Sequence, residues 1–262
     1  MSGLIYAEFV YYLQGLGFRI HNALKGGHDE QAYEEAVVWL LAKDNVPFQR
    51  QPIYYVTYKG QQVGKYRPDL IAGEEPTLLE LKATPEILPI HDAQALSYLA
   101  VTQLKLALIM NFGGAAMQYK RLPNFLDRRQ PFRWHATPTT TLLYPELTNT
   151  LLATLHEVHY TLGPGFLHSV YRRATYIELG HQGVQFQYIK ELPLRFEDHL
   201  LGLKPTRLFW VEQKLLLAAF ALQEITSLHL EKLRWAMQEM ECRLGLIANF
   251  YPSKLEIRIV RT

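Results

Sequence analysis

The chain lacks several features that would assign it to a class at once. Cys242 is the one cysteine among 262 residues, which excludes an internal disulfide and a cysteine-rich zinc site. The longest apolar run covers residues 215–222, far short of the roughly 20 residues that a membrane-spanning helix needs. No basic leader precedes the first apolar residues, where Glu8 already lies. We therefore expect no secretory signal, no membrane partner and a cytoplasmic location.

Neither sign of charge is in large excess. The chain has 27 Lys and Arg against 25 Asp and Glu, a net charge of +2, so any basic surface for nucleic acid must be local. Apolar residues make up 48% and charged residues 20%, a balance that excludes disorder and allows a substantial core. The length admits one large domain or two small ones.

An internal repeat decides between these two organisations. A constant offset of 138 residues aligns the two halves, and the register holds to the end of the chain. We expect a first copy over residues 1–124, a linker over 125–141 and a second copy over 142–262. Identical pairs include His21 and His159, Gly27 and Gly165, Tyr33 and Tyr171, Leu70 and Leu208, His91 and His229, and Asn111 and Asn249.

Hydrophobic periodicity and turn residues predict the elements of the first copy. We expect a helix to residue 23, an amphipathic helix over 30–43, and strands over 53–58, 62–71 and 77–81. A helix over 89–100 and strands over 104–112 and 117–122 follow. This order predicts an α/β fold for each copy.

Two carboxylates and a lysine form the most informative cluster. We expect Asp69 at the end of one strand and Glu80 in the next, so a hairpin can bring them together. The period of two in a strand places Glu80 and Lys82 on one face. Two carboxylates can hold Mg²⁺, and Lys82 could then orient or deprotonate a water. A solvated strand face is the alternative, because an isolated motif of this kind is weak.

Two weaker motifs flank this cluster. Gln94 and Tyr98 are four residues apart on the predicted third helix, where they share a face and could position a phosphate or water. Glu30 lies at a helix start within the pattern Gly27-x-x-Glu30-x-x-Tyr33. A first-turn glutamate is also favoured there by the helix dipole alone.

Taken in order, these motifs resemble the bacterial GxxExxY family of the PD-(D/E)XK nuclease superfamily. The resemblance spans nearly all of the first copy. It implies two tandem restriction-endonuclease-like domains, each a mixed sheet flanked by helices. It further implies Asp69 and Glu80 as metal ligands, Lys82 as the catalytic lysine, and Glu30 as an additional acidic residue of the site. Residues that carry it are Gly27, Glu30, Tyr33, Asp69, Glu80-Leu81-Lys82, Gln94, Tyr98 and Asn111-Phe112.

The second copy lacks every one of the chemically active residues. The offset of 138 places Arg207 at the position of Asp69, which would add a positive charge where the metal would lie. We therefore expect a degenerate domain that does not bind Mg²⁺, and we expect the shared histidines, tyrosines and asparagines to serve the fold. At Glu30, Asp69, Glu80, Lys82, Gln94 and Tyr98 it has His168, Arg207, Ala218, Phe220, Lys232 and Ala236.

A local basic patch lies at the end of the first copy and in the linker. Basic residues alternate there with aromatic ones, a mixture suited to phosphate contact and base stacking. An ordinary solvated linker whose aromatics pack on the domains is the alternative. The nucleic-acid-binding candidates are Lys120, Arg121, Arg128, Arg129, Arg133 and Trp134.

These observations lead to a leading hypothesis and an alternative. The first is a nuclease or phosphodiesterase that uses Mg²⁺ or Mn²⁺ and is active in the first copy. Its metal site would consist of Glu30, Asp69, Glu80 and the Leu81 carbonyl, and the second copy would act as a built-in dimer partner or substrate-binding arm. The alternative is an inactive scaffold of nuclease fold that binds nucleic acid or protein. DNA and RNA remain equally open, and we expect a monomer with an internal pseudo-dimer.

Overall fold

A computed structural model describes residues 4–124 and 143–261. The chain divides into two compact units. Unit 1 contains the described residues of the first copy except 58–63, together with residues 165–167. Unit 2 contains the described residues of the second copy except 165–167, together with residues 58–63.

Unit 1 is built on a five-stranded sheet with strand order β1-β4-β5-β6-β7. Strands β5 and β6 are parallel and are joined by helix α3, whereas the other neighbours are antiparallel. Strands β2 and β3 form a separate two-stranded sheet, whose residues 58–63 belong to unit 2. The elements are α1 (Ala7–Leu24), α2 (Glu30–Lys43), β1 (Phe48–Arg50), β2 (Tyr54–Tyr58), β3 (Gln61–Tyr66), β4 (Leu70–Ala72), β5 (Thr77–Lys82), α3 (Pro89–Thr102), β6 (Leu106–Asn111) and β7 (Gln118–Pro123).

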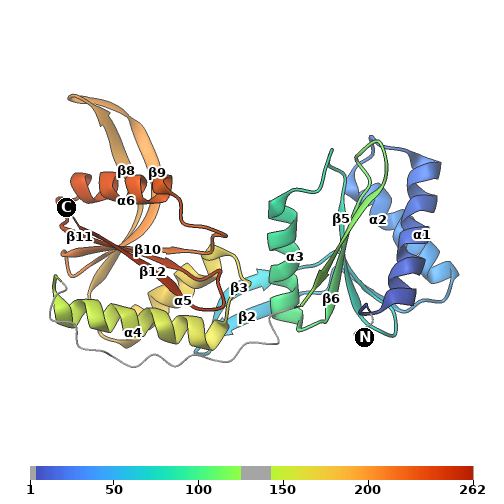
Figure 1. Cartoon of the computed structure of the whole chain (residues 1–262), viewed down its shortest axis with the longest axis horizontal. Coiled ribbons are helices and arrows are strands. Elements are labelled where there is room, and N and C mark those ends of the chain that lie inside the picture. Colours follow the sequence, from blue (N-terminus) through green and yellow to red (C-terminus); the bar gives the residue numbers. More distant parts are fainter. Residues whose placement is uncertain (1–3, 125–142, 262) are drawn as a thin grey trace. The chain divides into compact units, whose positions relative to one another are not determined.

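Helices cover both faces of this sheet, with α1 and α2 on one face and α3 on the other (Figure 1). The core beneath α1 and α2 includes Val10, Leu13 and Val37 from the helices and Leu79 and Leu81 from β5. Strands that are covered on both faces need apolar residues at consecutive positions. Accordingly β5 and β6 are buried along their whole length.

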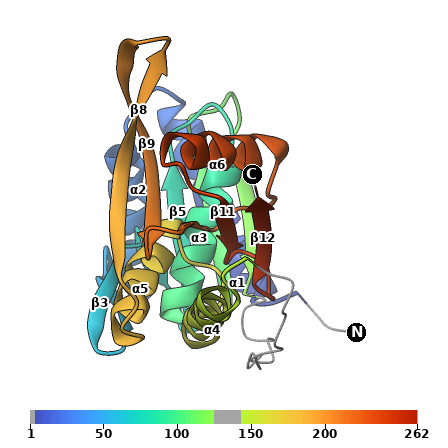
Figure 2. The same ribbon diagram turned by 90° about the vertical axis from the view of Figure 1, so that its left-hand side faces the viewer.

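Unit 2 repeats this arrangement with strand order β12-β11-β10-β9-β8. Strands β10 and β11 are parallel, and α6 connects them. Strands β8 and β9 form one long continuous hairpin (Figure 2). The elements are α4 (Pro145–Leu162), α5 (His168–His181), β8 (Phe186–Phe196), β9 (His199–Val211), β10 (Leu215–Phe220), α6 (Ser227–Glu239), β11 (Leu244–Asn249) and β12 (Glu256–Arg261).

The predicted elements of the first copy are confirmed, with one correction. The predicted strand 62–71 is two strands, β3 and β4, separated by residues 67–69. Pro68 in this break has no N–H to donate to a ladder, which explains why a continuous strand fails there. The short edge strand β1 was not predicted, because its three residues have no clear alternation. The α/β class and the two sheet-plus-helix domains are confirmed.

The offset of 138 residues holds for most elements but fails in one strand. Helices α4 and α5 and strands β10 to β12 begin and end 138 residues after their counterparts. In β9, however, Phe209 pairs with Leu217 as Leu70 pairs with Leu79, a local offset of 139. The turn before β10 covers residues 212–214, one residue shorter than the turn over 73–76. The second copy thus has one additional residue before Leu208 and one residue fewer in the following turn, so the offset returns to 138 at the start of β10.

This shift corrects the expectation for Arg207. Leu208 occupies the strand position that corresponds to Asp69, and Arg207, with a positive φ of 54°, precedes it. Because neighbouring residues in a strand point to opposite faces, a shift of one residue moves a side chain to the other side of the sheet. Arg207 therefore does not lie at the position of the lost carboxylate.

The residues shared by both copies serve the fold, as predicted. Tyr33 donates to Lys25 O and stacks on Phe112, and Tyr171 does the same with Gly163 O and Phe250. His21 and His159 bond to the carbonyls of Gly114 and Pro252. Asn111 and Asn249 bridge both backbone groups of Thr84 and Leu222. Each contact recurs at the same offset, so these side chains hold loops to the core.

No helix within the two described ranges is both long and apolar enough to cross a membrane.

Candidate active site in the first copy

Strand β5 presents Glu80 and Lys82 to the face of the sheet covered by α3. The alternate residues Leu79 and Leu81 belong to the core beneath α1 and α2. Since side chains alternate along a strand, Glu80 and Lys82 point the other way. Glu80 is fully buried, and Lys82 is 7% exposed. An acid and a base therefore lie in the interior side by side.

Asp69 is brought to the same place by the bend between β3 and β4. Its Oδ2 accepts a hydrogen bond of 2.7 Å from the backbone N–H of Leu81, the residue between Glu80 and Lys82. Its own carbonyl accepts from the N–H of Gln51, which connects the bend to the end of β1. The predicted juxtaposition of Asp69 and Glu80 therefore arises from the antiparallel pairing of β4 with β5.

The two carboxyl groups bind protons unusually strongly. Burial raises the pKa of Glu80 to about 8, and the charge of Asp69 adds to the increase although Lys82 opposes it. Burial likewise raises the pKa of Asp69 to about 6, opposed by the Leu81 hydrogen bond and by Lys82. Within the described chain, Glu80 Oε2 has no hydrogen-bond partner. A buried, unpartnered carboxylate oxygen is costly and needs a cation or a proton.

Lys82 connects Glu80 to Glu30 at the start of α2. Its Nζ lies 2.7 Å from Glu80 Oε1 and 3.9 Å from Glu30 Oε2. Burial alone would lower the pKa of Lys82, but the charge of Glu80 and the hydrogen bond to it raise that pKa, so the amine stays protonated. The Asp29 side chain caps the helix through Ala32 N, which makes Glu30 the first residue of α2. Glu30 is exposed, so it lies at the solvent-facing edge of the cluster.

Gln94 and Tyr98 lie one turn apart on α3. Gln94 Nε2 donates to the Tyr98 hydroxyl at 3.0 Å. Burial raises the pKa of Tyr98 to about 12, and the charge of Glu80 is the next largest cause. The tyrosine is therefore a neutral hydroxyl on the helix that faces Glu80. It can donate a hydrogen bond to a phosphate or a water there.

Glu34 is a further acidic residue that the motifs missed. It is 6% exposed, forms an ion pair with Arg50 and accepts hydrogen bonds from Gln51. Its charge contributes to the raised pKa of Asp69, together with that of Glu30. Glu34 lies four residues after Glu30 on one helix face, and this spacing could have revealed it.

The basic patch is only partly within the described residues. Lys120 Nζ lies 2.6 Å from Asp92 Oδ2, and Arg121 donates to the carbonyl of Ile5. Both side chains thus have intramolecular partners on unit 1. The other predicted nucleic-acid-binding residues, Arg128, Arg129, Arg133 and Trp134, lie outside the described residues.

The corresponding place in the second copy is an apolar pocket. Ala218 and Phe220 stand where the first copy has Glu80 and Lys82, and Leu208 stands where it has Asp69. Together with His229, Lys204 and Lys232 these residues line a cavity of about 630 Å³, and no acidic residue of the described chain is in its lining. The second copy therefore lacks the carboxylates of the first, as predicted, and it lacks them by apolar replacement rather than by charge reversal.

The donor set of the first copy fits a divalent cation that takes few protein ligands. In the two described ranges no group of three or more His, Cys, Asp or Glu side chains could hold a metal. Asp69 and Glu80 offer two carboxylates, and the free Oε2 of Glu80 is the orphaned atom that a cation would satisfy. Mg²⁺ is commonly held by one or two carboxylates and completes its shell with water and phosphate oxygens. The residues present are compatible with that mode.

Comparison with known proteins assigns the class. A family model described as the PD-(D/E)XK nuclease superfamily matches residues 7–122 and, a second time, residues 145–261. The chain therefore belongs to the PD-(D/E)XK nuclease superfamily and contains two tandem copies of its domain.

More specific comparisons add little. Among solved structures the chain is similar to the crystal structure of SSO0001, with 18% sequence identity and a TM-score of 0.28. That match covers 46% of this chain and 56% of the other, so the chain spans little more than half of that protein's length. No curated protein matches the chain.

Proposed function

We propose that this protein hydrolyses phosphodiester bonds in nucleic acid, with Mg²⁺ or Mn²⁺ bound in the first copy. The observation that carries the proposal is the buried Glu80 carboxyl, whose Oε2 has no partner among the described residues, beside Asp69 and Lys82. Membership in a superfamily of nucleases supports this reaction class. Adjacent carboxyl groups with raised pKa values, one buried and one half-buried, are typical of functional sites and support the same conclusion.

Asp69, Glu80 and the Leu81 carbonyl would hold the metal. When bound, the cation would supply an activated water and stabilise charge that develops on the scissile phosphate. The free Oε2 of Glu80 and the carboxylate of Asp69 are the oxygens available to it. A direct metal bond from Glu30 stays a prediction. Its carboxylate oxygen lies 3.9 Å from the Lys82 ammonium.

Lys82, Gln94 and Tyr98 would orient the substrate and donate hydrogen bonds to it. Lys82 keeps its proton and neutralises part of the charge on Glu80, while its ammonium is available to donate to a phosphate oxygen or to the attacking water. Tyr98 and Gln94 form a hydrogen-bonded pair on the opposite helix that can position the phosphate. Covering helices exclude bulk water, which strengthens each of these interactions.

Metal binding and cleavage test the proposal. We expect calorimetry with Mg²⁺ and Mn²⁺ to show binding to the full chain, and labelled DNA and RNA, single- and double-stranded, to be cleaved when metal is present. The variant Asp69→Asn/Glu80→Gln should lose both activities. Glu74→Gln is the matched control, because Glu74 is an exposed acid in the turn that joins β4 to β5.

Other outcomes would point to the alternative function. A wild-type chain that binds nucleic acid, takes up no metal and cleaves no substrate would be a scaffold of nuclease fold. Equal losses in Glu74→Gln and in the double variant would show that the effect is not local to the site. Whether the chain is a monomer, as predicted, is checked by sedimentation of the same samples.

A further inference from the structure

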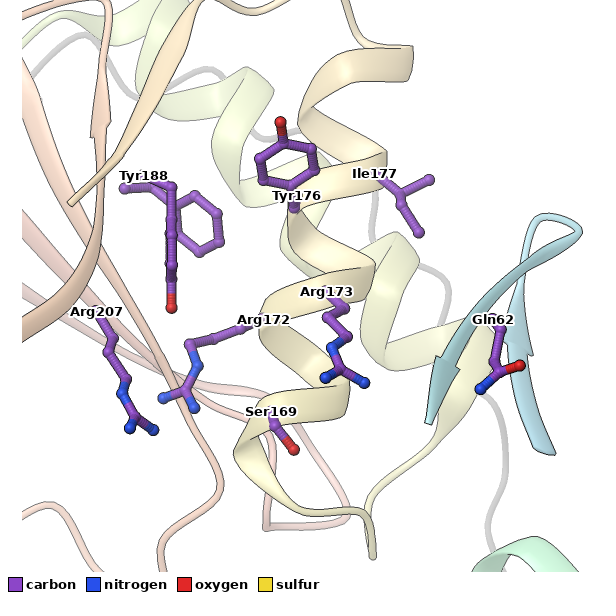
Figure 3. Close-up of a pocket in the computed structure, with 9 residues that line it drawn as sticks. Gln62, Ser169, Arg172, Arg173, Tyr176, Ile177, Tyr188 and Arg207 are labelled. Carbon is purple, nitrogen blue, oxygen red and sulfur yellow. The ribbon is translucent and has the colours of Figure 1, made fainter. Parts of the chain in front are cut away.

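Unit 2 contains a second, strongly cationic pocket, distinct from the apolar one. It has a volume of about 440 Å³ and lies between α5 and the paired strands β8 and β9. Three arginines, Arg172, Arg173 and Arg207, line it, and no aspartate or glutamate within residues 4–124 and 143–261 does. Ser169 and Tyr188 contribute hydroxyl groups (Figure 3). An arginine-rich lining without a carboxylate is a typical anion site.

Arg172 is the residue that most needs an external partner. It is only 9% exposed, and the described residues provide no ion-pair or hydrogen-bond partner for its guanidinium. A cation buried without a counter-charge is destabilising, whereas a bound anion would offset that cost. In Figure 3 its guanidinium points into the pocket, toward that of Arg207.

The helix position of Arg172 has a neutralised charge in the first copy. Glu34 corresponds to Arg172 at the offset of 138, and it is neutralised by Arg50 and Gln51. In the second copy Tyr188 takes the position of Arg50, and the neighbouring charges that lower the pKa of Arg172 after burial are those of Arg207 and Arg173. The charge at this position is therefore reversed, and the neutralising group is absent from the described chain.

Local electrostatics support an excess of positive potential. Burial lowers the pKa of His168, and the charges of Arg172 and Arg207 lower it further. Ser169, which lines the pocket, lies in the first turn of α5, so one end of the pocket is near the positive end of a helix dipole. Arg173 is partly engaged, since its Nη1 donates to the Val63 carbonyl at 3.0 Å. Arg172 and Arg207 remain available for a ligand.

We propose that this pocket binds the phosphate group of a nucleotide, with Arg172 and Arg207 as its charged ligands. Guanidinium forks match phosphate oxygens in pairs, and Ser169 and Tyr188 supply further donors. The volume exceeds what a phosphate fills and leaves room for the attached nucleoside beside Tyr176 and Tyr188, whose rings can stack on a base. That the phosphate belongs to nucleic acid rests on the proposed nuclease function.

Binding measured without divalent metal tests this site separately from cleavage. In EDTA we would titrate the full chain with inorganic phosphate, adenosine 5′-monophosphate, and a short single-stranded oligonucleotide with and without a 5′-phosphate. The variant Arg172→Gln/Arg207→Gln should bind about tenfold or more weakly than wild type, since each charge-assisted contact supplies that much. The slope of log affinity against log salt should fall by about two.

Control variants and probes distinguish a specific loss of binding from a general loss of charge or of folding, and they identify the molecule that carries the phosphate. Arg243→Gln removes an exposed arginine elsewhere in unit 2 and should bind as wild type does. Arg207→Gln alone changes an exposed side chain, so a loss of binding there cannot come from a disrupted core. Tight binding of the mononucleotide would identify a free nucleotide, whereas binding restricted to oligonucleotides would identify a strand, and dependence on the 5′-phosphate would identify its end.

Two results would overturn the proposal. One is a wild-type chain that binds none of the four probes, and the other is an equal loss in Arg243→Gln. The fold-loss of binding caused by Arg172→Gln/Arg207→Gln should be the same in the Asp69→Asn/Glu80→Gln background as in the wild-type background. A failure of the nuclease proposal would therefore leave this binding intact, and a failure of phosphate binding would leave metal-dependent cleavage in place.

Discussion

The two copies share their packing contacts and differ in the residues that face the helix between their parallel strands. Tyr33 and Phe112 stack in the first copy as Tyr171 and Phe250 do in the second. On the α3 side the first copy buries Glu80 and Lys82, whereas the second has Ala218 and Phe220 on the α6 side. The fold thus depends on one set of residues, and the chemistry depends on another that can be replaced independently.

One strand shows how such a replacement proceeds. In the first copy the chain breaks at Pro68 and Asp69, which leaves the carboxylate free to bond with Leu81 N. In the second copy β9 runs through this point, and its register moves by one residue. Leu208 then joins the core with Ala218, while Arg207 lines the pocket beside α5. The shift of one residue therefore places an apolar side chain at the position of Asp69 and an arginine on the opposite face of the sheet.

The largest expected effect concerns the lysine that only the first copy has. Lys82→Met should lower the rate of metal-dependent cleavage by roughly 10²–10⁴-fold, because the variant loses the ammonium beside the reacting group. Phe220→Met changes the equivalent position of the second copy and should leave the rate unchanged. Single-turnover cleavage measures both. Similar losses in both variants would contradict the assignment of activity to one copy.

A smaller effect tests the residues that both copies share. Phe112 and Phe250 are fully buried, and each stacks on a tyrosine. Phe112→Ala and Phe250→Ala should each lower the free energy of unfolding by about 3–5 kcal/mol through the cavity left behind. Urea unfolding followed by circular dichroism measures the loss. If one of the two substitutions were tolerated, the shared stack would not be equally important to both units.

Two buried glutamates, Glu80 in unit 1 and Glu178 in unit 2, have opposite pKa shifts. The pKa of Glu80 is raised, so the metal-free folded chain holds a proton that the unfolded chain releases. Its contribution to stability is present below the unfolded value of about 4.3 and is lost as the pH rises through about 8. In EDTA, Glu80→Gln should therefore lose less stability than wild type does as the pH rises from 5 to 8, with a difference on the order of a few kcal/mol.

Glu178 is the matched control in unit 2. Burial would raise its pKa, but hydrogen bonds from Lys59, Gln182 and Tyr58 hold that pKa below its ordinary value. Its contribution is present above the unfolded value and is lost as the pH falls. Relative to wild type, Glu178→Gln should therefore become more destabilising as the pH rises from 3 to 5, whereas Glu80→Gln should become less so from pH 5 to 8. Thermal unfolding from pH 3 to 8 measures both trends, and trends of the same sign would refute the contrast.

Much of the fold could be predicted from local patterns. The helix over residues 30–43 is confirmed with those bounds, because its capping residue Asp29 and its periodicity are local signals. Strand β1 and the break at residues 67–69 could not be predicted, since a three-residue edge strand depends on pairing with β4. The role of Glu34 depends on Arg50 and Gln51, which approach it only after the sheet has formed.

Sequence alone predicted the duplication, the α/β class and the cluster of Asp69, Glu80 and Lys82, because repeats, periodicity and motif spacing can be recognised along the chain. Tertiary structure decided which carboxylate oxygen is left without a partner and on which face Arg207 lies. It also decided that Arg172 is buried without a counter-charge in the described chain. Burial, pairing register and long-range charge are set only when distant segments pack, and no spacing in the chain encodes them by itself.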